Sequence, residues 1–220
     1  MTHALRAGLT FCAVEDRLLF LDVPADRYFC LAPAAEDAVR RLQGGAAPDT
    51  ADRAALAGLV RAGLLVEAPD APMLAPCPPA PSARYSLLDG PMPRPRGSDV
   101  AAALLQLVAA RIELRLTGFA ATLGRVARRK QRLRGRAGPH RIAAIAAAFH
   151  ATGGWVSVHD RCLPRAIAVA HRLMRAGASP DLVLAVKLGP FKAHAWVQCG
   201  DALVNERPEV TRAFTPILVL

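Results

Sequence analysis

A cysteine stands where a charged loop is expected to become a helix, in the segment HDRCLPRAIAVAHRLMRAG at residues 159–177. Asp160 is the expected N-cap, which places Cys162 in the first turn of that helix. First-turn N–H groups lack helical partners, and together with the positive end of the helix dipole they stabilise a thiolate. The pattern therefore predicts that Cys162 is a nucleophile. Taken alone, the residue is explained equally well as a small cysteine that packs in a core.

A histidine further along the chain supplies the second group that thiolate catalysis needs. His194 lies in KAHAWVQ, near the start of an expected strand. A nearby imidazole holds a thiolate as an ion pair and later protonates the leaving amine, while a third polar group fixes the ring tautomer. The next expected strand, DALVNE, offers Asn205 and Glu206 as that third group. Cysteine, histidine, then amide or acid, on helix, strand and strand, is the order of papain-like and transglutaminase-like folds.

The composition is that of a folded and strongly basic protein. Of the 220 residues, 53% are hydrophobic, and the formal net charge is +10. This content suffices for one large or two small domains, and the charge favours an anionic partner. The five cysteines form no C-x-x-C pair and no zinc-ligand spacing, and their odd number argues against a disulfide framework. We therefore expect a reducing, cytoplasmic location, and neither a metal nor a cofactor.

The N-terminus and the apolar runs give no sign of export or of a membrane span. The first residues, MTHALRAGLTFCAVEDRL, lack a basic region followed by an apolar signal core. The longest apolar runs, such as VAAALLQLVAA at 100–110, are too short to cross a bilayer. We expect no stable membrane insertion.

A proline-rich segment at 69–97 divides the chain, because prolines at this density remove backbone donors and interrupt helices and sheet interiors. Residues 1–68 read as three short strands, two helices and a last strand, which suggests a small winged-helix domain. Residues 98–220 read as a helix broken near Gly118, two further helices and then antiparallel strands, which predicts an α+β domain.

Three separated blocks of the second domain resemble one known family. The motifs RCLP, GPFKAHAWV and NERPEV, within about 155–212, are similar to the transglutaminase-like cysteine protease domain of lasso-peptide B proteins. The resemblance implies that Cys162 is the nucleophile and His194 its partner. The family usually has Asp as the third member, and the matching position here is Glu206, with Asn205 as the substitute. The implied reaction is hydrolysis of the bond between leader and core of a lasso-peptide precursor, before macrolactam formation.

The first domain resembles the RiPP recognition element, a PqqD-like winged fold that binds leader peptides. In that family the leader adds a strand to the edge of the third strand and packs against the last helix. Carried over to this sequence, the implied leader-binding residues are Arg27, Tyr28, Phe29, Cys30, Leu31, Leu56, Leu59 and Val60. The two resemblances together imply a fused lasso-peptide biosynthesis B protein. Its implied partners are the precursor peptide and an ATP-dependent, asparagine-synthetase-like macrolactam synthetase.

Two other functions fit the same residues. Cys162 and His194 also suit an acyl transferase of the transglutaminase type, in which an amine instead of water takes the acyl group. The second domain would instead be a scaffold if the protein were a non-catalytic module that binds peptide or DNA. The basic run at 125–136 is explained as a solvated helix face or as attraction to an acidic segment. Because this run lies outside the expected winged domain, we expect no nucleic-acid partner.

Overall fold

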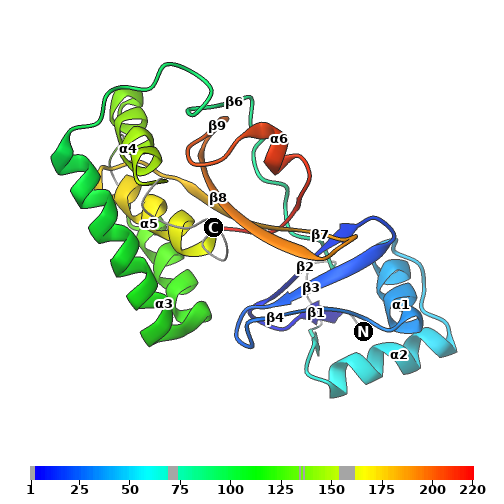
Figure 1. The fold of residues 1–220 in the computed structure, drawn as a ribbon. Helices are drawn as coiled ribbons and strands as arrows, with labels where there is room; N and C mark the ends of the chain where they lie inside the picture. The colour runs from blue at the N-terminus through cyan, green and yellow to red at the C-terminus, as the bar shows by residue number, and fades with distance from the viewer. Residues whose placement is uncertain (1–2, 69–73, 134, 136, 154–161) are drawn as a thin grey trace. The chain divides into compact units, whose positions relative to one another are not determined.

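A computed structural model describes residues 3–68, 74–133, 135, 137–153 and 162–220 (Figure 1). The chain divides into two compact units, Met1–Pro78 and Pro79–Leu220. The boundary falls inside the proline-rich segment. Each unit is described by itself.

The first unit is built on a three-stranded antiparallel sheet in the order β2-β3-β4. Its strands are β2 (Leu9–Val14), β3 (Arg17–Asp22) and β4 (Arg27–Cys30), while β1 (His3–Leu5) pairs with β5 (Leu65–Glu67) in a separate two-stranded sheet. The register aligns Phe11 with Phe20 and Phe20 with Phe29, and the neighbouring ring centroids lie 5.1 and 5.5 Å apart. Phe11 and Phe20 are buried in the core of the unit, and Phe29 is partly buried and packs against that core.

Two helices, α1 (Pro33–Gln43) and α2 (Thr50–Arg61), complete the first unit. The Asp49 carboxylate accepts from the N–H of Asp52, and the Asp52 carboxylate accepts from the N–H of Asp49, so a capping box begins α2. The unit therefore consists of small sheets and two helices. A PqqD-like winged helix remains a prediction.

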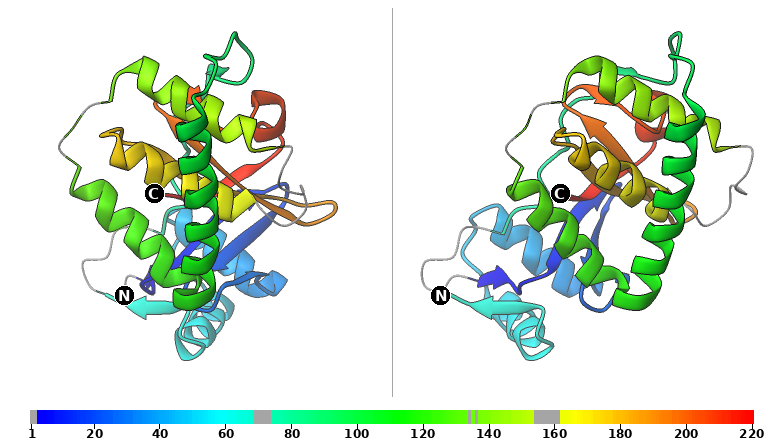
Figure 2. Two further views of the ribbon diagram at one scale, coloured as in Figure 1. Left: turned by 60° about the vertical axis from the view of Figure 1, so that its left-hand side comes forward. Right: turned by 90° about the vertical axis from the view of Figure 1, so that its left-hand side faces the viewer.

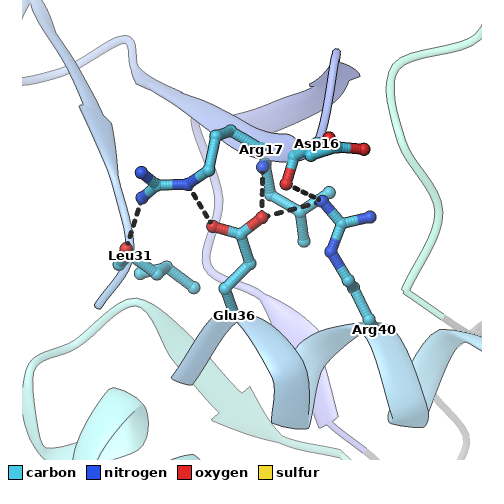
Figure 3. A network of polar contacts seen from close by, with 6 residues as sticks. Asp16, Arg17, Leu31, Glu36 and Arg40 are labelled. Carbon is cyan, nitrogen blue, oxygen red and sulfur yellow. Dashed lines mark hydrogen bonds and ion pairs between the residues drawn. The ribbon is translucent and has the colours of Figure 1, made fainter. Parts of the chain in front are cut away.

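A buried carboxylate joins α1 to the sheet (Figure 3). Glu36 is 4% exposed; it accepts hydrogen bonds from Arg17 at 2.9 Å, from Arg40 at 2.8 Å and from the N–H of Leu18 at 2.7 Å. Burial raises the pKa of Glu36, but the hydrogen bonds from Arg40, Arg17 and Leu18 outweigh it and hold that pKa below its usual range. The cluster fixes the start of β3 against α1.

Replacing this carboxylate is expected to weaken the first unit. Glu36→Gln should lower the free energy of unfolding of the first unit by about 2 kcal/mol at neutral pH, because the substitution removes charged hydrogen bonds from a buried site. The contribution exists above the unfolded pKa of about 4.3 and disappears as the pH falls through the lower folded pKa, so the difference between variants should vanish in acid. Hydrogen exchange of the β3 amides measures it. The exposed neighbour provides the control: Asp37→Asn should change nothing, and equal effects of the two substitutions would contradict the prediction.

The second unit places three helices beside a five-stranded sheet (Figures 1 and 2). The helices are α3 (Gly97–Gln131), α4 (Pro139–Ala151) and α5 (Cys162–Arg175). The fully buried side of α5 packs between α3 and the strand β8. Gly118 has φ 77° and ψ 174°, which interrupts α3 and confirms the expected break. Among the described residues, no helix combines the length and the apolar character needed to cross a membrane.

The sheet of this unit has the order β10-β7-β8-β9-β6. Its strands are β6 (Tyr85–Ser86), β7 (Asp181–Lys187), β8 (Lys192–Cys199), β9 (Ala202–Leu203) and β10 (Thr215–Val219), and a short helix, α6 (Pro208–Thr211), precedes β10. Pairing is antiparallel except between β6 and β9.

Two expectations about this sheet need correction. The segment 69–97 is more than a linker, because Tyr85–Ser86 forms an edge strand within it. Proline is excluded from sheet interiors but is tolerated at edges, so a short edge strand fits among the prolines. The strand expected over DALVNE ends at Leu203, and Asn205 and Glu206 lie in the loop that follows.

Candidate active site

Cys162 is the first described residue of α5, and its side chain is half-buried. This position agrees with a cysteine in the first helical turn, where N–H groups remain available to a sulfur anion. The expected N-cap, Asp160, lies outside the described residues.

His194 and Glu206 meet at one end of the sheet. His194 belongs to β8, and its Nε2 lies 2.7 Å from Oε2 of Glu206. The other carboxylate oxygen accepts the N–H of Arg207 at 3.0 Å, which fixes the orientation of the carboxylate. With Nε2 bonded to Glu206, Nδ1 is the ring nitrogen left for Cys162. The longer acid, found where the resembling family usually has Asp, thus reaches the imidazole.

The Asn205 side chain bonds to the backbone of β8, whereas the sequence made it an alternative partner of His194. Its Oδ1 accepts the N–H of Val197 at 2.7 Å, and the carbonyl of Val197 accepts the N–H of Val204 at 2.9 Å. The side chain therefore extends the pairing of β8 beyond the end of β9. Because alternate N–H groups of a strand point to the same edge, the N–H of Ala195 faces this edge too. Asn205 braces the strand and is not the partner of the imidazole.

The charges of these groups favour a thiolate–imidazolium pair. Burial raises the pKa of Cys162, but interactions with the His194 side chain and with the backbone of Ala195 and Leu163 outweigh burial and lower that pKa. For His194, burial lowers the pKa, but hydrogen bonds to Cys162 and Glu206 and the charges of both raise it to about 9. The two shifts are opposite in sign, which favours the thiolate–imidazolium pair over the neutral thiol and imidazole.

Two further side chains, which the sequence did not single out, interact with Glu206: Arg165 through its charge and Ser86 through a hydrogen bond to the main chain. Burial raises the pKa of Glu206, but its bonds to His194 and Arg207 and the nearby positive charge of Arg165 lower it. Arg165 lies in the first turn of α5 and donates to the carbonyl of Phe149 at 2.7 Å. Ser86, which is 4% exposed, donates from Oγ to the carbonyl of Glu206 at 2.7 Å. Neither residue belongs to a recognisable motif.

Aromatic rings flank the imidazole. The His194 ring centroid lies 6.1 Å from that of Trp196 and 5.3 Å from that of Phe214. Trp196 is 3% exposed, as expected for a core residue, and its indole N–H donates to Oε1 of Gln198 at 3.1 Å. The rings limit the access of water to one side of the ion pair.

The other cysteines with shifted pKa values differ from Cys162. Burial, followed by the charges of Cys77 and Cys30, raises the pKa of Cys12 to about 12. Burial and the charge of Asp181 raise the pKa of Cys199 to about 11. Both thiols therefore stay protonated at neutral pH. Within the described part of the chain, no group of three or more His, Cys, Asp or Glu is arranged to hold a metal ion.

The expected leader-binding residues fall into two groups. Leu31, Leu56 and Leu59 are buried in the core of the first unit, so they are not available for direct contact with a peptide. The others are partly or fully exposed, namely Arg27, Tyr28, Phe29, Cys30 and Val60. In the described residues β4 pairs with β3 alone, which leaves β4 at an edge of its sheet.

Removing the charge of Glu206 is expected to change the protonation of the ring. In Glu206→Gln the imidazolium loses its carboxylate, so the pKa of His194 should fall by about one unit or more. An NMR titration of the histidine side chains measures this shift. Glu209→Gln, which removes an exposed acid on α6, should leave the titration unchanged. An unaltered His194 titration in Glu206→Gln would show that the carboxylate does not hold the proton.

Comparison with known proteins adds one finding. A family model described as the Transglutaminase-like superfamily matches residues 104–219, a range that includes Cys162, His194 and Glu206. No match was found among curated proteins or among solved structures.

Proposed function

This chain belongs to the transglutaminase-like superfamily, and from that premise we propose that it is a cysteine peptidase of lasso-peptide biosynthesis. It binds the leader of a ribosomally made precursor and hydrolyses the bond between leader and core. The observation that carries the peptidase assignment is the arrangement of a helix-start cysteine, a histidine with its pKa raised to about 9 and a carboxylate 2.7 Å from the ring. The precursor assignment is supported by the RCLP, GPFKAHAWV and NERPEV motifs.

The reaction follows from these groups. The Cys162 thiolate attacks the scissile carbonyl carbon, and a negative charge develops on the oxygen, toward which the Cys162 N–H is the candidate donor. As the C–N bond breaks, His194 gives its proton to the leaving amine, which becomes the N-terminus of the core. The leader remains as a thioester on Cys162. His194 then takes a proton from water, the hydroxide attacks the thioester, and the leader leaves with a free carboxylate as the thiolate returns.

In this proposal the first unit binds the substrate and holds it near the peptidase. Residues 1–68 bind the leader by strand addition next to β4, the last strand of its sheet, where main-chain hydrogen bonds supply affinity. Tethering raises the effective concentration of the scissile bond at the peptidase, so tight binding next to the cut is not required. The freed core, with a new amino group, passes to an ATP-dependent macrolactam synthetase.

The products formed in labelled water test the proposal. The full chain is incubated with a candidate lasso-peptide precursor in water enriched in oxygen-18, and the masses of the products are measured. We expect an intact core with a free amine and a leader whose new carboxylate carries one labelled oxygen. Adding a primary amine separates the related activity, because an acyl transferase would give mainly a leader–amide adduct. An uncut precursor, or such an adduct as the main product, would overturn the proposal.

A further inference from the structure

Arg165 is a charged neighbour of Cys162 on the helix that carries the sulfur. It lies three positions further along α5, and residues three apart are neighbours on the surface of a helix. Its side chain is half-buried, whereas the residues that follow it, 166–170, are fully buried. A positive charge is thus held beside the proposed nucleophile and out of full contact with water.

The guanidinium of Arg165 is bonded to the end of a neighbouring helix. α4 packs against α5 (Figure 1), and the Phe149 carbonyl in the last turn of α4 accepts a hydrogen bond from Nη2 of Arg165 at 2.7 Å. The same carbonyl accepts the hydroxyl of Thr152 at 2.6 Å and its N–H at 3.2 Å, and Thr152 is 0% exposed. The last carbonyls of a helix lack helical partners and form its negative dipole end, so a cation is stabilised there. This contact joins the start of α5 to the end of α4.

Glu206 is the second negative partner of Arg165. Burial lowers the pKa of Arg165, and the charge of Glu206 acts against that effect. In return, the charge of Arg165 is among the causes that keep the pKa of Glu206 low. The carboxylate oxygens of Glu206 are bonded to His194 and to the N–H of Arg207, so Arg165 acts on the carboxylate through its charge.

Arg165 balances the charge of the proposed catalytic group. The thiolate of Cys162 and the carboxylate of Glu206 are negative, while the imidazolium of His194 and the guanidinium of Arg165 are positive. Without the guanidinium, the other three groups would hold one unmatched negative charge, which is costly in a site shielded from water. His150, in the last turn of α4, is exposed to solvent and supplies no buried charge.

We propose that Arg165 is a positioning residue of the peptidase: it fixes the first turn of α5, and with it Cys162, to the end of α4, and its charge keeps the thiolate–imidazolium–carboxylate group electrically balanced. The inference rests on the proposed peptidase function and adds a fourth residue to its site. Arg165 acts on the reacting atoms through Glu206 and through the position of the helix. The charge of residue 165 should therefore control the reactivity of Cys162.

Two variants that both keep an N–H donor at residue 165 test this role in the full chain. Arg165→Gln removes the charge, whereas Arg165→Lys keeps it. In Arg165→Gln we expect the pKa of Glu206, followed by carbon-13 NMR of the glutamate carboxyl groups, to rise by about half a pH unit or more. Alkylation of Cys162 by iodoacetamide near pH 6.5 should slow by about threefold or more, because the unmatched negative charge opposes the thiolate. Arg165→Lys should restore most of both properties.

Arg172→Met provides the matched control. Arg172 is also a half-buried arginine of α5, but its Nη2 donates to Oδ1 of Asp99 on α3 at 3.4 Å. The substitution removes a contact between two helices, so it should lower the thermal stability. It should leave the Glu206 titration and the alkylation rate of Cys162 unchanged, because Arg172 does not belong to the charged group.

The possible results separate this inference from the function on which it rests. An unmoved Glu206 titration in Arg165→Gln, or equal losses in Arg165→Gln and Arg165→Lys, would show that Arg165 is only structural and would overturn the inference. The peptidase would stand in that case, since Cys162 of the unchanged protein would still react rapidly near pH 6.5. Slow alkylation of Cys162 in the unchanged protein would contradict the peptidase itself. If Arg165→Gln failed to fold, a folded Arg165→Lys in which Cys162 reacts as slowly as in urea would contradict the role of the charge.

Discussion

Cys162→Ala is expected to leave the precursor peptide uncut, with kcat/KM reduced about a thousandfold or more. The substitution removes the atom that attacks the carbonyl, while the pKa shifts of Cys162 and His194 show that the structure favours its anion. No other described thiol is placed against the imidazole to take over the attack. A time course of precursor cleavage followed by mass spectrometry measures the effect.

Cys199 provides the matched control. It lies in the same strand as His194, but its pKa is raised to about 11, so its thiol stays protonated and takes no part in the reaction. Cys199→Ala should cut the precursor at the normal rate. If Cys162→Ala also produced core at that rate, the second unit would be a non-catalytic scaffold, and both the peptidase and the acyl-transferase assignments would fail.

His194→Gln is expected to slow iodoacetamide alkylation of Cys162 by about tenfold or more near pH 6.5, where an ordinary thiol is only about 1% ionised. With the imidazolium present, the pKa of Cys162 is lowered, so a larger fraction of the sulfur is ionised at this pH. Without it, burial remains and raises the pKa of the thiol, so the reactive fraction falls. In the unchanged protein, cleavage should decline above about pH 9, as His194 loses the proton that it gives to the leaving amine.

The alkylation profile has its own control. His140→Gln changes an exposed histidine of α4 and should leave the rate and its pH dependence unaltered. Unfolding the protein in urea should abolish the advantage of Cys162 at low pH, because the ion pair depends on the fold. A folded protein in which Cys162 reacts no faster near pH 6.5 than it does in urea would contradict the ion pair.

The sequence predicted the elements that carry the reactive groups because each has a strong local signal. The amphipathic run after Cys162 is helical, the alternating residues around His194 form a strand, and the break of α3 falls at Gly118. The transglutaminase-like character of the second domain, expected from its motifs, is confirmed by the family match over 104–219. Local periodicity and short motifs were sufficient for these features.

The sequence could not show which of two adjacent residues is the third member of the catalytic site. Asn205 and Glu206 are adjacent and both polar, and which of them meets the ring depends on where β9 stops. Because β9 ends at Leu203, the amide turns to Val197 and the acid turns to His194. A strand of two residues has no periodicity to read, so its end was not predictable.

In the first domain, the sequence did not show which of the expected leader-binding residues are buried. The helix and strand positions were recognisable, but Leu31, Leu56 and Leu59 join the core instead of a binding surface. An apolar residue on a short amphipathic element serves either purpose, and only the packing of neighbouring elements decides between them. The leader-binding role of the exposed residues stays a prediction.

The bond between Ser86 and the Glu206 carbonyl bears on how the peptidase can be studied in isolation. Ser86 is distant in sequence from the acid that it supports, yet it belongs to the same sheet through the pairing of β6 with β9. Trimming the chain to the matched range 104–219 would delete this donor. It would also delete Pro81, whose carbonyl accepts a hydrogen bond from the Gln198 side chain. A shortened protein that keeps its N-terminal boundary at Pro79 retains both, and is the smallest piece expected to keep the surroundings of Glu206 intact.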